Sequence, residues 1–171
     1  MNEFYTHRPY LIRELNKLLK KKNVRVLEFG IGDGSSEIFY YYTKMYSNIK
    51  VIGFENDFNW YNKIKSKYEN SNYTFEYVSD WNLYLNEYNF LNCYDLIFID
   101  QNPWDARIKT LDMLKNISST IILHDYDYYN KELIENIYSV GEHSFFDKYH
   151  NSFNLESFYK TLPPTMIFTK K

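Results

Sequence analysis

Cysteine is almost absent from this sequence, since Cys93 is the only one in 171 residues. A single cysteine excludes an intramolecular disulfide and a metal site of the CxxC type. Long apolar runs are absent as well: no stretch approaches the roughly 18 consecutive apolar residues of a membrane-spanning helix, and no apolar signal segment stands near the start. We therefore expect an intracellular, cytoplasmic protein with no membrane partner.

Sustained stripes of Lys and Arg residues are also absent from the sequence. The formal net charge is -2, and the one dense basic cluster, Lys17 with Lys20–Lys22, lies at the expected end of the first helix, where cations suit the helix dipole. A long nucleic-acid footprint needs several Lys and Arg side chains on one face. A nucleic-acid partner is therefore not predicted, whereas a homo-oligomer remains open.

Glycine is scarce but concentrated. Three of the 5 glycines lie in the segment Gly30–Gly34, after the apolar run 24–27 and before the helical pattern 36–46. A strand, a glycine loop and a helix N-terminus together are typical of a nucleotide-binding corner. Ser35 and Ser36 stand where a dinucleotide fingerprint has its later glycine, and Glu28 would repel a pyrophosphate but suit a cationic ligand. NAD binding and an ordinary strand-to-helix turn are the alternatives.

Short apolar runs alternate with helical patterns along most of the chain. The expected strands are 24–29, 49–54, 73–78, 94–100 and 120–124, and the expected helices are 9–22, 36–46, 58–68, 81–88 and 107–115. Such alternation predicts one α/β domain over residues 1–171, with a doubly wound, mostly parallel sheet and helices on both faces. In the tail we expect a helix at 132–140 and an antiparallel strand pair at 142–149 and 165–169, which completes seven strands.

The glycine loop resembles the first motif of the class I S-adenosylmethionine-dependent methyltransferases, E/D-x-G-x-G-x-G, at Glu28, Gly30, Gly32 and Gly34. The resemblance covers nearly the whole chain, because these enzymes have a Rossmann-like, seven-stranded sheet that ends in an antiparallel pair. It implies S-adenosylmethionine as cofactor, held by this loop and by Ser35.

Acids also end the second and third expected strands. Glu55 stands where a ribose needs acceptors for its two hydroxyls. The resemblance implies that Asp80 takes the adenine amino group and that Trp81 packs on the adenine ring. The alternatives are an exposed strand end for Glu55, a helix N-cap for Asp80 and core packing for Trp81.

Candidate catalytic residues end the fourth and fifth expected strands. A hydroxyl nucleophile must lose its proton or be held on a metal as the new bond forms. Asp100 and Asp125 are predicted to face each other, as catalytic residues and as ligands of Mg²⁺ or another divalent cation, and His124 is the alternative base. The metal-dependent sugar and catechol-type O-methyltransferases, which the chain loosely resembles, have an acid pair or Asp-Asn after the fifth strand; here Tyr126 takes the second position.

The expected acceptor is a hydroxyl of a sugar, a glycan or another small polar molecule. The spacing from Asp100 through Pro103 to Arg107 resembles a pattern of carbohydrate-directed O-methyltransferases, which implies that Arg107 orients the substrate. The N-terminal segment 1–22 is expected on the acceptor side, with Tyr5, His7 and Arg8 as candidate contacts.

Two other functions stay open. The segment Asn102–Trp104 partly matches the N-P-P-[YFW] motif of enzymes that methylate exocyclic amines, although the second proline is absent. A cofactor-binding partner subunit without catalysis would keep the cofactor acids and would not depend on Asp100, His124 or Asp125.

Overall fold

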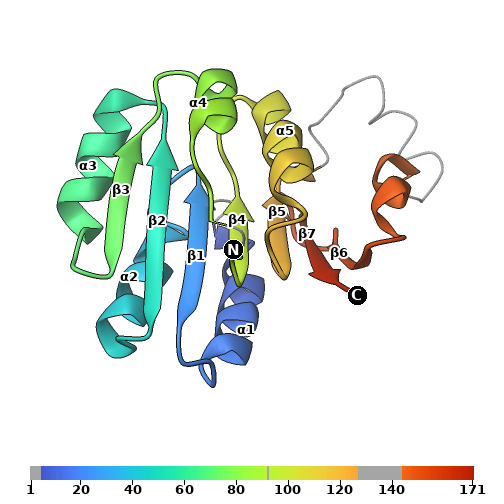
Figure 1. Cartoon of the computed structure of the whole chain (residues 1–171), viewed down its shortest axis with the longest axis horizontal. Helices are drawn as coiled ribbons and strands as arrows, with labels where there is room; N and C mark the ends of the chain where they lie inside the picture. Colours follow the sequence, from blue (N-terminus) through green and yellow to red (C-terminus); the bar gives the residue numbers. More distant parts are fainter. Residues whose placement is uncertain (1–4, 92, 127–143) are drawn as a thin grey trace.

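The computed structural model describes residues 5–91, 93–126 and 144–171 (Figure 1). A seven-stranded sheet runs through the chain in the order β3-β2-β1-β4-β5-β7-β6. The first five strands are parallel, and β7 pairs antiparallel with both β5 and β6. The strands are β1 (Val24–Phe29), β2 (Ile49–Glu55), β3 (Tyr73–Tyr77), β4 (Leu96–Ile99), β5 (Thr120–His124), β6 (Phe153–Phe158) and β7 (Thr165–Lys170).

Helices cover both faces of the sheet. One apolar cluster joins one face of the sheet to α1, α2 and α3, and a second joins the other face to α4, α5 and η3 (Figure 1). Along β1, Val26 belongs to the first cluster while Leu27 belongs to the second, as the two-residue period of a strand requires. The helices are α1 (Arg8–Leu18), α2 (Ser36–Met45), α3 (Phe58–Tyr68), α4 (Trp81–Glu87), α5 (Trp104–Leu114) and the 3-10 helix η3 (Ser144–Tyr149). None of these described helices has both the length and the apolar character needed to cross a membrane.

The centre of the sheet positions the site. Every residue of β4 is buried, which agrees with the apolar run that predicted a central strand. β1 lies between β2 and β4, so the strand order changes direction there, and a ligand crevice is expected outside the carboxyl ends of the strands at such a point. The tips are tied together, because Asp100 N–H donates to Phe29 O (2.7 Å) and Gly30 N–H donates to Phe54 O (2.9 Å).

The predicted sheet is confirmed, but one of its strands was placed wrongly. Residues 144–149 of the expected strand 142–149 form η3, and the strand beside β7 is β6, at residues 153–158, where no strand was expected. Phe146 and Tyr149 are both buried on the core, and a spacing of three residues suits a 3-10 turn. The expected helix 132–140 lies outside the described residues.

Candidate active site

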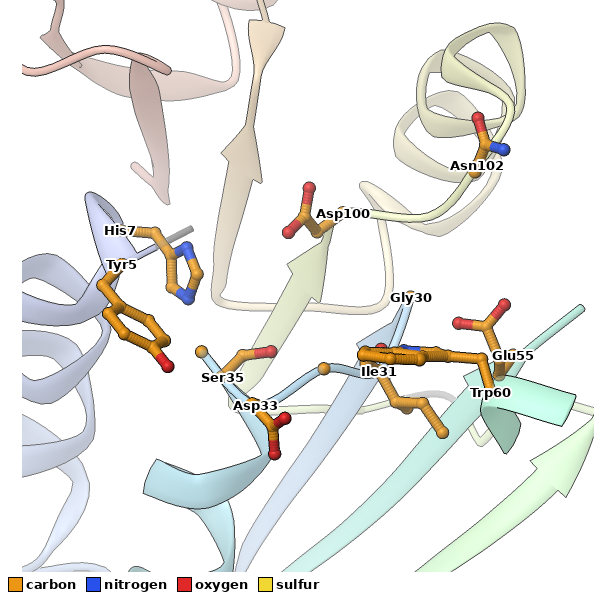
Figure 2. Close-up of a pocket in the computed structure, with 12 residues that line it drawn as sticks. Tyr5, His7, Gly30, Ile31, Asp33, Ser35, Glu55, Trp60, Asp100 and Asn102 are labelled. Carbon is orange, nitrogen blue, oxygen red and sulfur yellow. The ribbon is translucent and has the colours of Figure 1, made fainter. Parts of the chain in front are cut away.

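A cleft of about 440 Å³ opens at the carboxyl ends of β1, β2 and β4 (Figure 2). This volume is in the range of small-molecule sites, roughly 300–1,000 Å³. The cleft is lined by Tyr5, His7, Gly30, Ile31, Gly32, Asp33, Gly34, Ser35, Glu55, Trp60, Asp100 and Asn102. The N-terminal segment, the glycine loop and the tips of two further strands therefore meet at one place.

Two glycines of the loop serve different purposes. Gly30 has a φ of +82°, and a Cβ atom there would lie 2.5 Å from the backbone of Asp100 and Gln101. Glycine at this position lets the tips of β1 and β4 approach each other. A Cβ on Gly32 would meet nothing within 4 Å, so its backbone stands open on the cleft.

Glu28 supports the loop from beneath and does not line the cleft. Its carboxylate is fully buried and accepts hydrogen bonds from the hydroxyls of Ser35 (2.5 Å), Ser36 (2.9 Å) and Tyr73. Burial raises the pKa of Glu28 to about 8, despite these hydrogen bonds. The residue thus joins β1 to the start of α2, and the direct contact with a cationic ligand that its position predicted is not provided by this geometry.

Glu55 and Trp60 form the wall on the β2 side. Glu55 ends β2, is 7% exposed, and its Oε1 accepts from the N–H groups of Asn56 and Asp57 at 2.8 Å each. Burial nevertheless raises the pKa of Glu55 above its ordinary value. Trp60 donates from Nε1 to Ile31 O (2.6 Å), and Figure 2 shows its indole ring beside Ile31 and Glu55.

Sequence reasoning missed Trp60, although a signal was present. Asp57 caps the N-terminus of α3 by accepting from Trp60 N–H (2.9 Å). This cap fixes the first turn of the helix directly after β2, so a large side chain in that turn remains next to the strand tip.

Asp80 and Trp81 lie outside this cleft. Asp80 Oδ1 caps α4 by accepting from the N–H groups of Asn82 (2.7 Å) and Leu83 (3.1 Å). Trp81 is buried, and its Nε1 donates to Asn102 O (2.8 Å). Both alternatives raised from the sequence, a cap and core packing, describe these contacts. The two residues also line a smaller hollow of about 200 Å³. This hollow adjoins the cleft, because it is lined by Asn56 and Pro103, which directly follow the cleft residues Glu55 and Asn102.

Arg107 joins the tips of β4 and β5. Its Nη2 lies 3.0 Å from Asp100 Oδ1 and its Nη1 lies 3.4 Å from Asp125 Oδ2. The same guanidinium donates to the backbone carbonyls of Asp100, Gln101 and His124. Arg107 is 6% exposed and does not line the cleft, so the geometry supports a clamp rather than the predicted substrate contact.

The position of Arg107 also bears on the predicted metal pair. A guanidinium already bridges Asp100 and Asp125, and it would repel a divalent cation placed between the same carboxylates. Asp125, like Arg107, does not line the cleft, and burial raises its pKa.

His124 is held between two partners. Its Nδ1 lies 3.2 Å from Asp100 Oδ1, and its Nε2 lies 3.0 Å from Thr6 Oγ1. Burial lowers the pKa of His124, but the Asp100 carboxylate outweighs that effect and the net shift is upward. Burial conversely raises the pKa of Asp100, but the charges of His124 and Arg107 outweigh it and the net shift is downward. Asp100 is therefore an ionised carboxylate at neutral pH.

The three N-terminal candidates separate in the structure, because Tyr5 and His7 line the cleft and Arg8 does not. His7 is 2% exposed, borders the cleft, and packs against His124 with ring centroids 4.6 Å apart. Burial, followed by the charge of His124, lowers the pKa of His7 to about 3. Arg8 lies outside the cleft. Its Nη2 donates to Glu37 Oε2 (2.8 Å), and its Cζ lies 5.0 Å from the centre of the Tyr5 ring.

No protein-family model matches the chain, and no curated protein sequence matches it. Solved structures do resemble it. A putative O-methyltransferase from Klebsiella pneumoniae is 14% identical with a TM-score of 0.67, over 97% of this chain and 80% of that one. A putative caffeoyl-CoA O-methyltransferase from Staphylococcus aureus is 14% identical with a TM-score of 0.68, over 95% and 82%.

A methyltransferase from Podospora anserina, solved with SAH (S-adenosylhomocysteine) bound, is 14% identical with a TM-score of 0.61, over 98% of this chain and 80% of that one. At such identities the likeness concerns the fold. The chain has the Rossmann-like fold of the class I S-adenosylmethionine-dependent methyltransferases, as its sequence motifs predicted.

Proposed function

We propose that this protein is an S-adenosylmethionine-dependent O-methyltransferase, acting as one domain on a hydroxyl of a small polar acceptor, with sugars and glycans as the preferred class. One observation carries the proposal. The ionised Asp100 stands on the wall of the same cleft as the open backbone of Gly32 and the carboxylate of Glu55.

The cleft fits the cofactor in shape and in its polar groups. At Gly32 no side chain obstructs the approach of a ligand to the loop. The Glu55 carboxylate lines the cleft, and we assign it as the acceptor for the ribose hydroxyls. Trp60 closes one side, and the adjoining hollow with Asp80 and Trp81 is where we place the adenine. The bound cofactor would supply an activated methyl group on its sulfonium.

The chain's own task is to position the acceptor hydroxyl and to receive its proton. Asp100 is the ionised acceptor on the cleft wall, and Arg107 and His124 hold it from behind. Positioning and general-base catalysis are effects of known size, since a well-placed base contributes roughly 10²–10⁴-fold. Thr6 fixes the far side of the His124 ring, so we assign His124 as a positioning residue of Asp100.

The walls favour a polar acceptor. Tyr5, His7, Asp33 and Asn102 surround the opening with hydrogen-bonding groups, and two of them come from the N-terminal segment. This arrangement supports the expectation that residues 1–22 contribute to the acceptor side. A polyhydroxyl molecule would find more partners there than a flat apolar one.

The first test is a calorimetric titration of the full chain with S-adenosylhomocysteine. We expect micromolar affinity, about -8 kcal/mol. Glu55→Gln should weaken binding by about 1.5–3 kcal/mol, the size of a hydrogen bond to a charged group. Glu69→Gln serves as the matched control, because Glu69 lies at the end of α3 and forms an ion pair with Lys65 on the surface.

The second test transfers labelled methyl groups from S-adenosylmethionine to a panel of sugars, uronic acids, catechols and nucleosides. Label on a sugar hydroxyl supports the full proposal. Label on an exocyclic amine would overturn O-methylation. Tight cofactor binding with no transfer to any acceptor would instead favour a non-catalytic partner subunit.

A further inference from the structure

His7, Asp100 and His124 each offer one ligand atom, and these three atoms lie within 4.8 Å of one another. We propose that this cluster, the His7–Asp100–His124 centre, binds a first-row transition-metal ion such as Zn²⁺, rather than Mg²⁺. The proposal does not rest on methyl transfer, because it concerns a binding site that can be measured without cofactor or acceptor.

His7 is the first reason. Both of its ring nitrogens are buried, and neither has a hydrogen-bond partner among the described residues. A buried polar group without a partner is costly, and such groups usually have a role. His7 borders the cleft, and Figure 2 shows it on the side facing Asp100. A metal ion would satisfy one of its nitrogens.

Thr6 is the second reason, because it fixes the tautomer of His124. The Thr6 hydroxyl donates its proton to Pro163 O (2.8 Å), so it can only accept from His124 Nε2–H (3.0 Å). Nδ1 faces Asp100 and carries a proton when His124 is charged. A metal ion that replaces this proton would find the Nδ1 lone pair as its ligand, while Nε2–H stays with Thr6. Metal-binding histidines almost always donate their other ring N–H to an oxygen in this way.

The spacing of the ligand atoms is the third reason. Two ligands that each bind Zn²⁺ at about 2.0–2.1 Å, at angles between octahedral and tetrahedral, lie roughly 2.8–3.4 Å apart. His124 Nδ1 and Asp100 Oδ1 are 3.2 Å apart. His7 completes the set from the N-terminal segment with a small rotation or shift, since all three atoms already lie within 4.8 Å.

The chemistry of the ligands selects the metal. Two imidazole nitrogens and one carboxylate oxygen suit Zn²⁺, Co²⁺ or Fe²⁺, whereas Mg²⁺ prefers oxygen ligands and retains water. Three protein ligands leave coordination positions open, and two of the three, His7 and Asp100, line the cleft. This set shares only Asp100 with the Asp100–Asp125 pair predicted from the sequence, and two imidazoles replace Asp125. Arg107 remains a neighbour of Asp100, with Nη2 3.0 Å from Oδ1.

The experiment measures metal binding directly on the purified full chain. After treatment with a chelator, the protein is equilibrated with Zn²⁺ or Co²⁺, and bound metal is counted by mass spectrometry while Co²⁺ is followed by its visible absorption. We expect about one ion per chain, with Mg²⁺ unable to displace it. His7→Gln and His124→Gln should each weaken binding at least tenfold.

Matched variants keep the outcome interpretable. His150→Gln is the control, because His150 is an exposed histidine that pairs with Asp147. Thr6→Val should weaken binding by about 10–100-fold, and Thr6→Ser should restore it.

Binding of S-adenosylhomocysteine and circular dichroism report whether each variant is folded. If His124→Gln does not fold, the His7 and Thr6 variants decide the outcome. Failure of the wild-type chain to retain either ion, or unchanged affinity in His7→Gln, would overturn the proposal without touching the proposed methyl transfer.

Discussion

Glu28 and Asp100 lie at the tips of two neighbouring parallel strands, and their pKa values are shifted in opposite directions. Glu28 is surrounded by hydroxyl groups, and burial raises its pKa to about 8. Asp100 is held by Arg107 and His124, whose charges outweigh the effect of burial and lower its pKa.

The charge of the partners, rather than position on the strand, therefore decides the protonation state and the role of a buried acid. A hydroxyl stabilises an ionised carboxylate less than a neighbouring cation does. Glu28 therefore remains a largely neutral support beneath the loop, whereas Asp100 keeps its charge and opens on the cleft. Four predictions test this contrast, in order of decreasing expected effect.

Asp100→Asn should separate the two acids most strongly. We expect turnover to fall by about 10²–10⁴-fold, because the amide cannot receive a proton, while affinity for S-adenosylhomocysteine stays nearly unchanged. Turnover is measured with the acceptor found in the screen, and Glu28→Gln is the companion variant. Equal losses in both variants would break the proposed contrast.

Gly30→Ala should destabilise the protein at the contact between the tips of β1 and β4. The added Cβ would lie 2.5 Å from the Asp100 backbone at a positive φ, so we expect the free energy of unfolding to drop by about 3 kcal/mol or more. Urea denaturation measures this. Gly32→Ala is the matched substitution, since its Cβ meets open space; it should leave stability nearly intact and weaken cofactor binding instead. A stable Gly30→Ala protein would contradict the tight junction.

Glu28→Gln should change how stability depends on pH. The folded pKa of Glu28 is about 8, above its ordinary value of 4.5, so between these values the folded state holds a proton that the unfolded state has lost. This group therefore makes the wild type less stable as pH rises, by roughly 1.4 kcal/mol per pH unit, or about 2–3 kcal/mol from pH 6 to pH 8.

The glutamine variant lacks this proton, so its free energy of unfolding should fall less steeply over the same interval. Denaturation in urea at pH 6, 7 and 8 measures both slopes. Parallel curves for the two proteins would show that Glu28 is ionised in the folded state.

Asp80→Ala should have the smallest effect, because Asp80 is an exposed acid whose Oδ1 accepts from the backbone N–H groups of Asn82 and Leu83. Loss of an N-cap costs about 1 kcal/mol of stability. Affinity for S-adenosylhomocysteine distinguishes the two roles. A fall of tenfold or more would assign Asp80 to the adenine, and an unchanged affinity would leave it as a helix cap alone.

Local patterns predicted more of the fold than of the site. The acids at the ends of β1, β2 and β4 were identified from the apolar runs that precede them, because parallel strands end at one edge of a sheet. The edge strand β6 was missed because its alternation of apolar and polar residues is short and only Phe153 is well buried among its six residues. Arg107 was assigned to substrate because no local pattern indicates which carbonyls an arginine will meet.

Local patterns in the sequence were enough for the order of strands and helices as far as β5, for the glycine loop and for the acids at the strand tips, since periodicity and glycine spacing are local properties. Only the tertiary structure decided which acid is neutral, what lies between Asp100 and Asp125, and that His7 meets His124. The physical reason is that burial and the charge of neighbours depend on contacts between distant residues. Thr6 reaches His124 across 118 positions of the chain, and no local pattern encodes that approach.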